Sequence, residues 1–209
     1  MQAAFTHLEQ TLKKYAPLSD QALNRYFSAC HFIHVAKGTT LYAIGEIPSS
    51  FAFIHKGLMR AYLIDEEGNE FNKNFFAEGR FPGSMSALLN NQTSFLGIEA
   101  LEDCDIITID FKQFRRELFA DHELMAFHIN YLEQHWLLEK EPKEIGYLQH
   151  EAKQRYMMFL DKYEAILSRL PQYHIASYLG ITPTQLSRIR KDLNNLSSGK
   201  IFNCFYQHM

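Results

Sequence analysis

The sequence predicts an α+β chain with a helical N-terminus, an antiparallel β-roll or sandwich, a long helix and an all-α C-terminal module. Three observations predict this order. The spacing of apolar residues changes from helical to alternating near Phe32 and back near Phe111. Glycines separate the β-rich pieces at intervals of about 7 to 12 residues. A tight two-helix pattern then occupies residues 169–193. The 209 residues are 46% hydrophobic and 22% charged, which is typical of a globular protein of one or two domains.

Two short helices are predicted at the N-terminus. Apolar residues of the first recur at helical spacing, at Phe5, Leu8, Leu12 and Tyr15. Pro17, followed by Ser19 and Asp20, ends this helix and begins a second over residues 21–29.

The β-roll is predicted over residues 32–110. Its short strands are separated by turn glycines, namely Gly38, Gly45, Gly57 and Gly68. Residues 104–110 have the pattern of a closing strand, and residues 111–118 return to helical spacing.

Residues 123–150 are predicted as a long helix that pairs with a second copy of itself. Leu124, Tyr131, Leu138 and Ile145 recur at seven-residue intervals, and Phe127 and Leu148 also lie on this apolar seam. The same stripe could instead pack on its own domain, and Pro142 should kink or break the helix. We therefore expect a homodimer of chains that divide into a roll domain (1–122), a dimerisation helix (123–150) and a C-terminal domain (151–209).

Residues 169–193 have the pattern of a DNA-binding helix-turn-helix. Gly180 permits the turn, Thr182 is a natural N-cap, Pro183 suits the first helical position, and Gln185 completes a capping box. The inward positions are Ile175, Ala176, Leu179, Ile181, Leu186, Ile189 and Leu193.

The opposite face of the second helix is predicted to contact DNA. Its polar and cationic residues are Thr184, Gln185, Ser187, Arg188 and Lys191. Residues 151–209 hold eight Lys and Arg against four Asp and Glu, whereas residues 1–150 hold 13 against 20. Because phosphate binding depends on local charge, an acidic chain can still bind double-stranded DNA through this module. An ordinary helical hairpin with a solvated basic face is the alternative.

The order of parts, with the segments KGTTLYAIGE, IHKGLMRAYLIDEEG and ALEDCDIITID, resembles the Crp/Fnr family of bacterial transcription regulators. The segment PQYHIASYLGITPTQLSRIRK is especially similar to the helix-turn-helix of Crp-like regulators of Bacteroidetes-type genomes. The resemblance implies a cyclic-nucleotide-binding-like jelly roll, a dimerisation helix and a reader of a pseudo-palindromic operator, and it allows RNA polymerase as a further partner. The family's β-hairpin wing has little room here, so we expect it to be reduced or absent.

The segment that corresponds to the family's phosphate-binding cassette lacks its charged residues. Cyclic-AMP-binding members have a Gly-Glu pair and, about ten residues later, an Arg-Ser or Arg-Thr pair, where this chain has Gly83 and Ser84, then Ser94 and Phe95. No Lys or Arg lies between Ser84 and Glu99, and a buried phosphate without a cation would be strongly unfavourable. We therefore do not expect cyclic AMP as a ligand.

An effector of another kind would use the same region, and its identity is unknown. The candidate pocket residues are Gly83, Ser84, Met85, Thr93 and Ser94. The apolar side chains of the segment could line a pocket, but we expect them to fill the roll; they are Met85, Leu88, Leu89, Phe95 and Leu96.

The sequence offers no pattern for an enzyme, a metal or a cofactor. A metal-binding cupin needs a close His-x-His, whereas His31 and His34 should face opposite sides of a strand, and His55 stands alone. The three cysteines are too scattered for a disulfide framework or a metal site, and Cys30 and Cys104 are predicted to be buried. No nucleophile motif or phosphate loop is present.

The sequence also contains no apolar run of membrane length and no secretory signal, so we expect a cytoplasmic protein with no membrane partner. The alternative to a DNA-binding regulator is a small-molecule sensor or interaction protein of the same fold, whose helical C-terminus binds protein rather than DNA.

Overall fold

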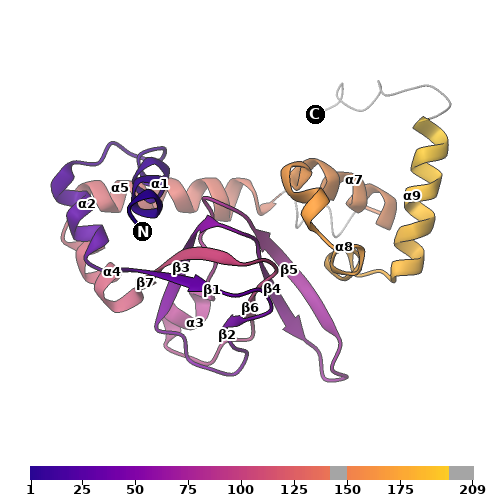
Figure 1. Cartoon of the computed structure of the whole chain (residues 1–209), viewed down its shortest axis with the longest axis horizontal. Coiled ribbons are helices and arrows are strands. Elements are labelled where there is room, and N and C mark those ends of the chain that lie inside the picture. The colour runs from indigo at the N-terminus through magenta and orange to yellow at the C-terminus, as the bar shows by residue number, and fades with distance from the viewer. Residues whose placement is uncertain (142–149, 198–209) are drawn as a thin grey trace. The chain divides into compact units, whose positions relative to one another are not determined.

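The computed structural model describes residues 1–141 and 150–197 (Figure 1). The chain divides into two compact units, Met1–Ile145 and Gly146–Met209, which are described separately below as unit 1 and unit 2. The predicted break at Pro142 and the seam residues Ile145 and Leu148 lie outside the described residues.

Unit 1 begins with the two predicted helices, α1 (Gln2–Leu12) and α2 (Asp20–Phe27). Leu8 and Leu12 are fully buried, as the helical spacing predicts. Ser19 caps α2, because its hydroxyl accepts a hydrogen bond from the backbone N–H of Ala22 at 3.2 Å. The N-terminal prediction is therefore confirmed.

Seven strands form two antiparallel sheets, which confirms the predicted β-roll. They are β1 (Cys30–Val35), β2 (Thr40–Tyr42), β3 (Ser50–Lys56), β4 (Met59–Ile64), β5 (Glu70–Phe76), β6 (Gly97–Ala100) and β7 (Cys104–Asp110). One sheet has the order β1–β7–β3 and the other β2–β6–β4–β5. The four predicted turn glycines all have positive φ angles, which side chains disfavour.

Strands β3 and β7 of the sheet β1–β7–β3 are buried on both faces. In β3, Phe51 and Phe53 join a core cluster shared with the helices, whereas Ala52 and Ile54 join a second cluster between the two sheets. This alternation follows from the two-residue period of a strand, and β7 alternates in the same way. The roll therefore has one core between its sheets and another beneath its helices.

The remaining helices of unit 1 complete the second core. They are α3 (Met85–Asn90), α4 (Phe111–Phe119) and α5 (His122–Leu132), which continues into a π-helical segment, η1 (Glu133–Leu138). Asp110 caps α4 through the backbone N–H of Gln113 at 2.7 Å. Helices α1, α2, α4 and α5 gather at one end of the roll (Figure 1).

Unit 2 is helical throughout its described part. It comprises α7 (Ala152–Lys162), the 3-10 helix η2 (Glu164–Arg169), α8 (Gln172–Leu179) and α9 (Pro183–Ser197). Its core includes the rings of Phe159, Tyr163 and Tyr178, whose centroids lie 4.8 to 5.5 Å apart. Residues 150–197 contain no strand, and the segment after α9, like residues 142–149, lies outside the described residues. No described helix is both long and apolar enough to cross a lipid bilayer.

Candidate nucleic-acid interface

The turn between α8 and α9 is built on Gly180. Its φ is +65°, the left-handed conformation in which a helix commonly ends. The N–H groups of Gly180 and Ile181 donate to the carbonyls of Ser177 and Ala176, at 3.3 and 3.1 Å. These bonds satisfy the last carbonyls of α8, and the left-handed residue redirects the chain.

The predicted capping box at the start of α9 is present. The backbone N–H of Gln185 donates to the Thr182 hydroxyl at 3.2 Å, and the Gln185 side-chain oxygen accepts from the backbone N–H of Thr182 at 2.9 Å. Pro183 is the first residue of α9, where a missing N–H costs nothing. The position of the helix start is therefore fixed by three local features.

The inward residues lie where the helical spacing predicts. Ile175, Ala176, Leu179 and Leu186 are at most 2% exposed, whereas Ile181, Ile189 and Leu193 are half-buried. Sequence reasoning missed Arg155, whose guanidinium donates to the carbonyl of Leu179 at 3.2 Å and to that of His150 at 2.9 Å. This contact ties α7 to the end of α8.

All five residues predicted to face DNA are exposed on α9: Thr184, Gln185, Ser187, Arg188 and Lys191. The side chain of Gln185 is partly occupied within the protein, because its oxygen accepts hydrogen bonds from both the backbone N–H and the hydroxyl of Thr182. Its amide NH₂ remains as a donor, so it can offer a base one hydrogen-bonding group without breaking the cap. Arg190 is a further exposed cation of this helix that the sequence analysis did not select.

The predicted dimer seam requires correction at two residues. Leu124 and Phe127 are 1% and 3% exposed within a single chain, in the core beneath the helices, and so are unavailable to a second copy. Tyr131 is half-buried against the same core, and Leu138 is 63% exposed. The first half of the stripe therefore packs on its own domain, which was the alternative interpretation.

A different set of apolar residues is exposed on this helix: Ile129, Trp136, Leu137 and Leu138, at 44% to 63%. The seven-residue spacing missed Ile129, which lies in α5, and also Trp136 and Leu137, which lie in the π-helical segment η1. A π-turn holds more residues than an α-turn and therefore rotates the following side chains relative to the seam.

A polar network holds η1 against the rest of unit 1. The Tyr15 hydroxyl lies 2.6 Å from His135 Nε2, His135 Nδ1 contacts Glu139, and Arg80 donates to both carboxylate oxygens of Glu139 at 3.0 and 3.3 Å. Burial would raise the pKa of Glu139, but the hydrogen bonds from His135 and Arg80 outweigh it and hold this pKa at about 2. The segment is thus anchored by Tyr15, which follows α1, by Arg80 of the roll and by Glu139 at its own end.

The candidate effector residues lie in different surroundings. Ser94 is buried, and its hydroxyl accepts from the N–H of Leu96 and donates to the same residue's carbonyl, at 3.0 and 2.8 Å. A side chain at Gly83 would lie 2.7 Å from the Cβ of Phe51. Thr93 is exposed, and Ser84 is buried at the start of α3. None of these residues carries a cationic side chain that could pair with an anionic ligand.

The apolar residues of this segment have divided roles. Leu88 is buried in the core as expected, but Phe95 is 82% exposed. Met85 and Leu89 line an apolar cavity of about 220 Å³ between α3, α4 and α5. The expectation that these side chains fill the roll is therefore wrong for Phe95 and for Leu89, which is 58% exposed. Met85 packs against the core, as expected, and also lines the cavity.

The expectation that His55 stands alone is also wrong. Its Nδ1 lies 3.2 Å from Nδ1 of His7 on α1, and burial together with the nearby His55 lowers the pKa of His7. Cys30 and Cys104 are both buried, as predicted. Burial raises the pKa of Cys30 to about 12 and that of Cys104 to about 11, which keeps these thiols protonated and unreactive.

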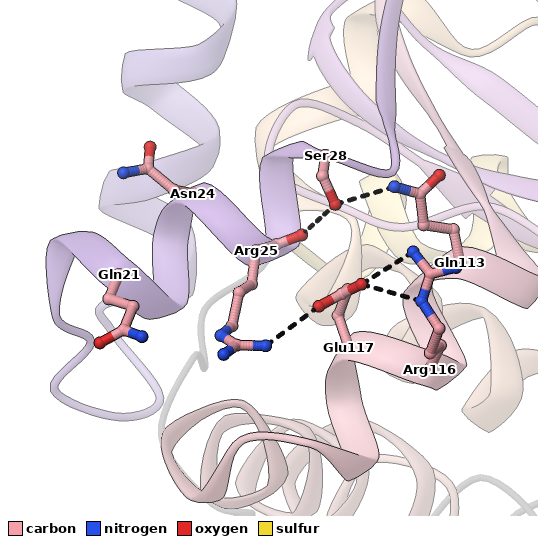
Figure 2. Close-up of a pocket in the computed structure, with 7 residues that line it drawn as sticks. All are labelled: Gln21, Asn24, Arg25, Ser28, Gln113, Arg116 and Glu117. Atoms are coloured by element: carbon pink, nitrogen blue, oxygen red, sulfur yellow. Dashed lines mark hydrogen bonds and ion pairs between the residues drawn. The ribbon is translucent and has the colours of Figure 1, made fainter.

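A groove between α2 and α4 is lined by polar side chains (Figure 2). Arg25 donates to Glu117 at 3.3 Å and lies 3.7 Å from Asp121, and Arg116 also contacts Glu117 at 2.9 Å. Gln113 donates to the Ser28 hydroxyl at 2.9 Å. These groups pair with one another, so their hydrogen bonds and ion pairs hold the two helices together.

Comparison with known proteins finds a family match within unit 1. Residues 32–121 match the cyclic nucleotide-binding domain. The chain is 26% identical over 109 residues to the cAMP-activated global transcriptional regulator CRP of Salmonella typhimurium. This match covers 52% of each protein, so the chain spans about half the length of the curated relatives it matches.

Two solved structures extend the likeness over most of the chain. FixK2 from Bradyrhizobium japonicum has a TM-score of 0.67 and 16% identity, with 84% of this chain and 89% of that one covered. The c-di-GMP responsive global regulator CLP of Xanthomonas campestris has a TM-score of 0.65 and 15% identity, with 86% and 93% covered. At these identities the likeness concerns the fold.

Proposed function

We propose that this chain, which belongs to the Crp/Fnr family of transcription regulators, binds operator DNA as a homodimer through the exposed face of α9. Family membership follows from the cyclic nucleotide-binding domain, the similarity to CRP and the fold shared with FixK2 and CLP. The relatives are named as regulators and not as enzymes. A site of action in the cytoplasm, where the DNA is, is part of this proposal.

The observation that carries the proposal is the construction of α9. Its start is fixed by a capping box, its inner side is held by Leu186, and its outer side presents two hydroxyl residues and two cations. A helix that is rigidly placed, polar at its N-terminal end and cationic further along suits the major groove, where short side chains approach bases and Arg and Lys reach guanine or phosphate.

Arg188 and Lys191 are assigned different roles on this face. Phosphate contacts supply affinity for any sequence, whereas contacts to base edges supply discrimination. Arg188 lies about one turn into the helix, so we assign it a bidentate contact to guanine, with Thr184 beside it. Lys191, further along the helix, is assigned to phosphate.

Replacing Arg188 by Ala is expected to weaken binding to a preferred site by about 1–3 kcal/mol and to relax the preference at one position per half-site. Replacing Lys191 by Ala should weaken binding to preferred and random DNA alike and reduce the salt slope by about one per subunit. The measurement is fluorescence anisotropy over a series of salt concentrations, with DNA selected by the purified protein from a random pool.

Arg190→Ala is the matched control, because Arg190 is equally exposed on α9 but is rotated away from Thr184 and Arg188. Unchanged discrimination in a folded Arg188→Ala variant would contradict the assignment of α9 as the reader of bases. Failure to select any sequence, together with capture of a protein by unit 2, would favour the alternative in which this unit binds protein.

The dimer proposal rests on the exposed apolar residues of α5 and η1. Replacing Leu137 by Glu is expected to convert a dimer of twice 24.4 kDa into a monomer in light scattering, because the charge would be buried in the helix pair. Gln134→Glu, a new charge on a neighbouring exposed polar residue, is the control and should leave the dimer intact. A wild-type chain that remains a monomer with and without DNA would contradict this part of the proposal.

Control by cyclic AMP is not part of the proposed function. The segment 84–99 contains no Lys or Arg, and the polar groups of Ser94 are occupied by the protein itself. We expect cyclic AMP to leave the affinity for selected DNA unchanged. Any effector of this chain would therefore need a site of different chemistry.

A further inference from the structure

We propose that the apolar cavity between α3, α4 and α5 binds a small apolar carboxylate, whose charged group pairs with Arg115. This ligand site goes beyond the proposed function and does not depend on DNA binding. It is separate from most of the predicted effector residues, since Gly83, Ser84, Thr93 and Ser94 are not among its lining residues.

The cavity is suited to a hydrocarbon or aromatic body. Its volume is about 220 Å³, below the roughly 300–1,000 Å³ of pockets for drug-sized ligands, which restricts it to a small molecule. Its walls are mainly apolar and aromatic, and include Phe51, Phe81, Met85, Phe114 and Phe127. An apolar, aromatic wall of this kind favours an apolar ligand over a hydrated one such as a sugar or an inorganic ion.

Arg115 supplies a cation at this cavity that the protein does not neutralise. Its guanidinium lies 4.4 Å from the ring centroid of Phe119 and 5.9 Å from that of Phe111, one turn away on each side of α4. Across the described ranges, no carboxylate forms an ion pair with it, whereas the adjacent Arg116 pairs with Glu117 at 2.9 Å. Stacking on Phe119 restrains the guanidinium and leaves its N–H groups free for a planar acceptor.

Among the residues that the structure describes, the other titratable side chains that line the cavity are His128 and the phenols of Tyr26 and Tyr131. Burial, together with the neighbouring Arg115, lowers the pKa of His128, and burial raises the pKa of both tyrosines. These three groups are therefore neutral near pH 7. The charge presented by the lining is that of Arg115, which complements an anion and disfavours a cation.

Trp136 links this cavity to the surface proposed for dimerisation. It lines the cavity from η1 and is 44% exposed beside Leu137. It is also the single tryptophan of the chain, so its fluorescence reports directly on the occupancy of the cavity. A bound ligand would pack against one side of a segment whose other side chains face the proposed partner.

Titration of the full chain with decanoate, followed by Trp136 fluorescence and by calorimetry, tests the proposal. We expect a saturable change with one equivalent bound per chain. The neutral analogue 1-decanol and the cationic analogue decyltrimethylammonium should bind at least about tenfold more weakly, since they cannot form the charge-assisted hydrogen bonds with Arg115.

Arg115→Gln should reduce decanoate affinity about tenfold and leave the affinity for 1-decanol unchanged. Arg116→Gln, the adjacent arginine outside the cavity, should bind decanoate as the wild type does. If Arg115→Gln does not fold, Arg115→Lys provides the test: it keeps the charge but loses the two-pronged geometry, and should show a smaller loss.

Three results would overturn the proposal: no saturable change with decanoate, equal binding of decanoate and 1-decanol, or equal decanoate affinity in the wild type and Arg115→Gln. A decanoate affinity that decreases as the fraction of dimer increases would show that a second copy of the chain covers the cavity. That result would also overturn the proposal. None of these outcomes bears on selection of DNA by α9, so the two proposals fail independently.

Discussion

A Gly57→Ala variant is expected to lose about 3–5 kcal/mol of the unfolding free energy of unit 1, which is a large fraction of the stability of a typical domain. Gly57 joins β3 to β4 with a φ of +109°, a conformation that side chains rarely adopt. A Cβ there would lie 2.5 Å from Cys104 Sγ and 2.9 Å from both Asp103 O and Cys104 Cα. The backbone strain at Gly57 and the clash with backbone atoms of Asp103 and Cys104 therefore both contribute to the loss of stability.

The matched control is Gly38→Ala. Gly38 also has a positive φ, +80°, but an added Cβ would meet nothing within 4 Å. This variant should lose only about 1–2 kcal/mol, from backbone strain alone. Urea unfolding followed by Trp136, which lies in unit 1, measures both losses. Equal losses in the two variants would show that strain, and not the contact with Cys104, determines the cost at Gly57.

Replacing Arg60 by Met is expected to lower the unfolding free energy of unit 1 by about 3 kcal/mol. Arg60 is 6% exposed on β4, and its guanidinium contacts Glu99 on β6 and Glu70 on β5 at 2.6 Å, and Asn72 on β5 at 3.1 Å. One buried cation thus ties together three strands of the sheet. Its removal leaves two carboxylates without their shared partner, and Glu99 is partly buried.

The double variant Arg60→Met with Glu99→Leu separates two explanations for that loss. If the loss of stability comes from the charge of Glu99, which no longer has Arg60 beside it, the double variant should regain at least about 1 kcal/mol of unfolding free energy. The reason is that an apolar pair can replace a buried ion pair. The readout is again the urea midpoint of unit 1. A double variant less stable than Arg60→Met would show that packing of the Glu99 stem, and not its charge, matters more.

The features of α8 and α9 were predictable because they depend on neighbours in the sequence. Thr182 and Gln185 are three residues apart, Gly180 acts on its own backbone, and the 3.6-residue period places Leu186 inside and Arg188 outside. The roll was predictable for a similar reason, since alternation within a strand and turn glycines between strands are local signals.

The helix predicted to pair with a second copy shows the limit of a local sequence period. The seven-residue spacing of Leu124 and Leu138 assumes an unbroken α-helix, but the π-helical turn of η1 changes the phase between them. The core of the roll then takes Leu124, and Leu138 is left exposed. The period of a sequence identifies an apolar stripe, but it does not say which neighbour covers each part of it.

The sequence by itself determined the order of the units, the helix caps, the turns and the polar face of α9, because each depends on backbone geometry within a few residues. Only the tertiary structure decided the contacts of His7 with His55, of Tyr15 with His135 and of Arg60 with Glu99, which are 39 to 120 residues apart. It also decided that Arg115 faces an apolar cavity without a carboxylate partner among the described residues. Such pairings depend on how the strands and helices pack, and no local pattern encodes the distance between two side chains that chain folding brings together.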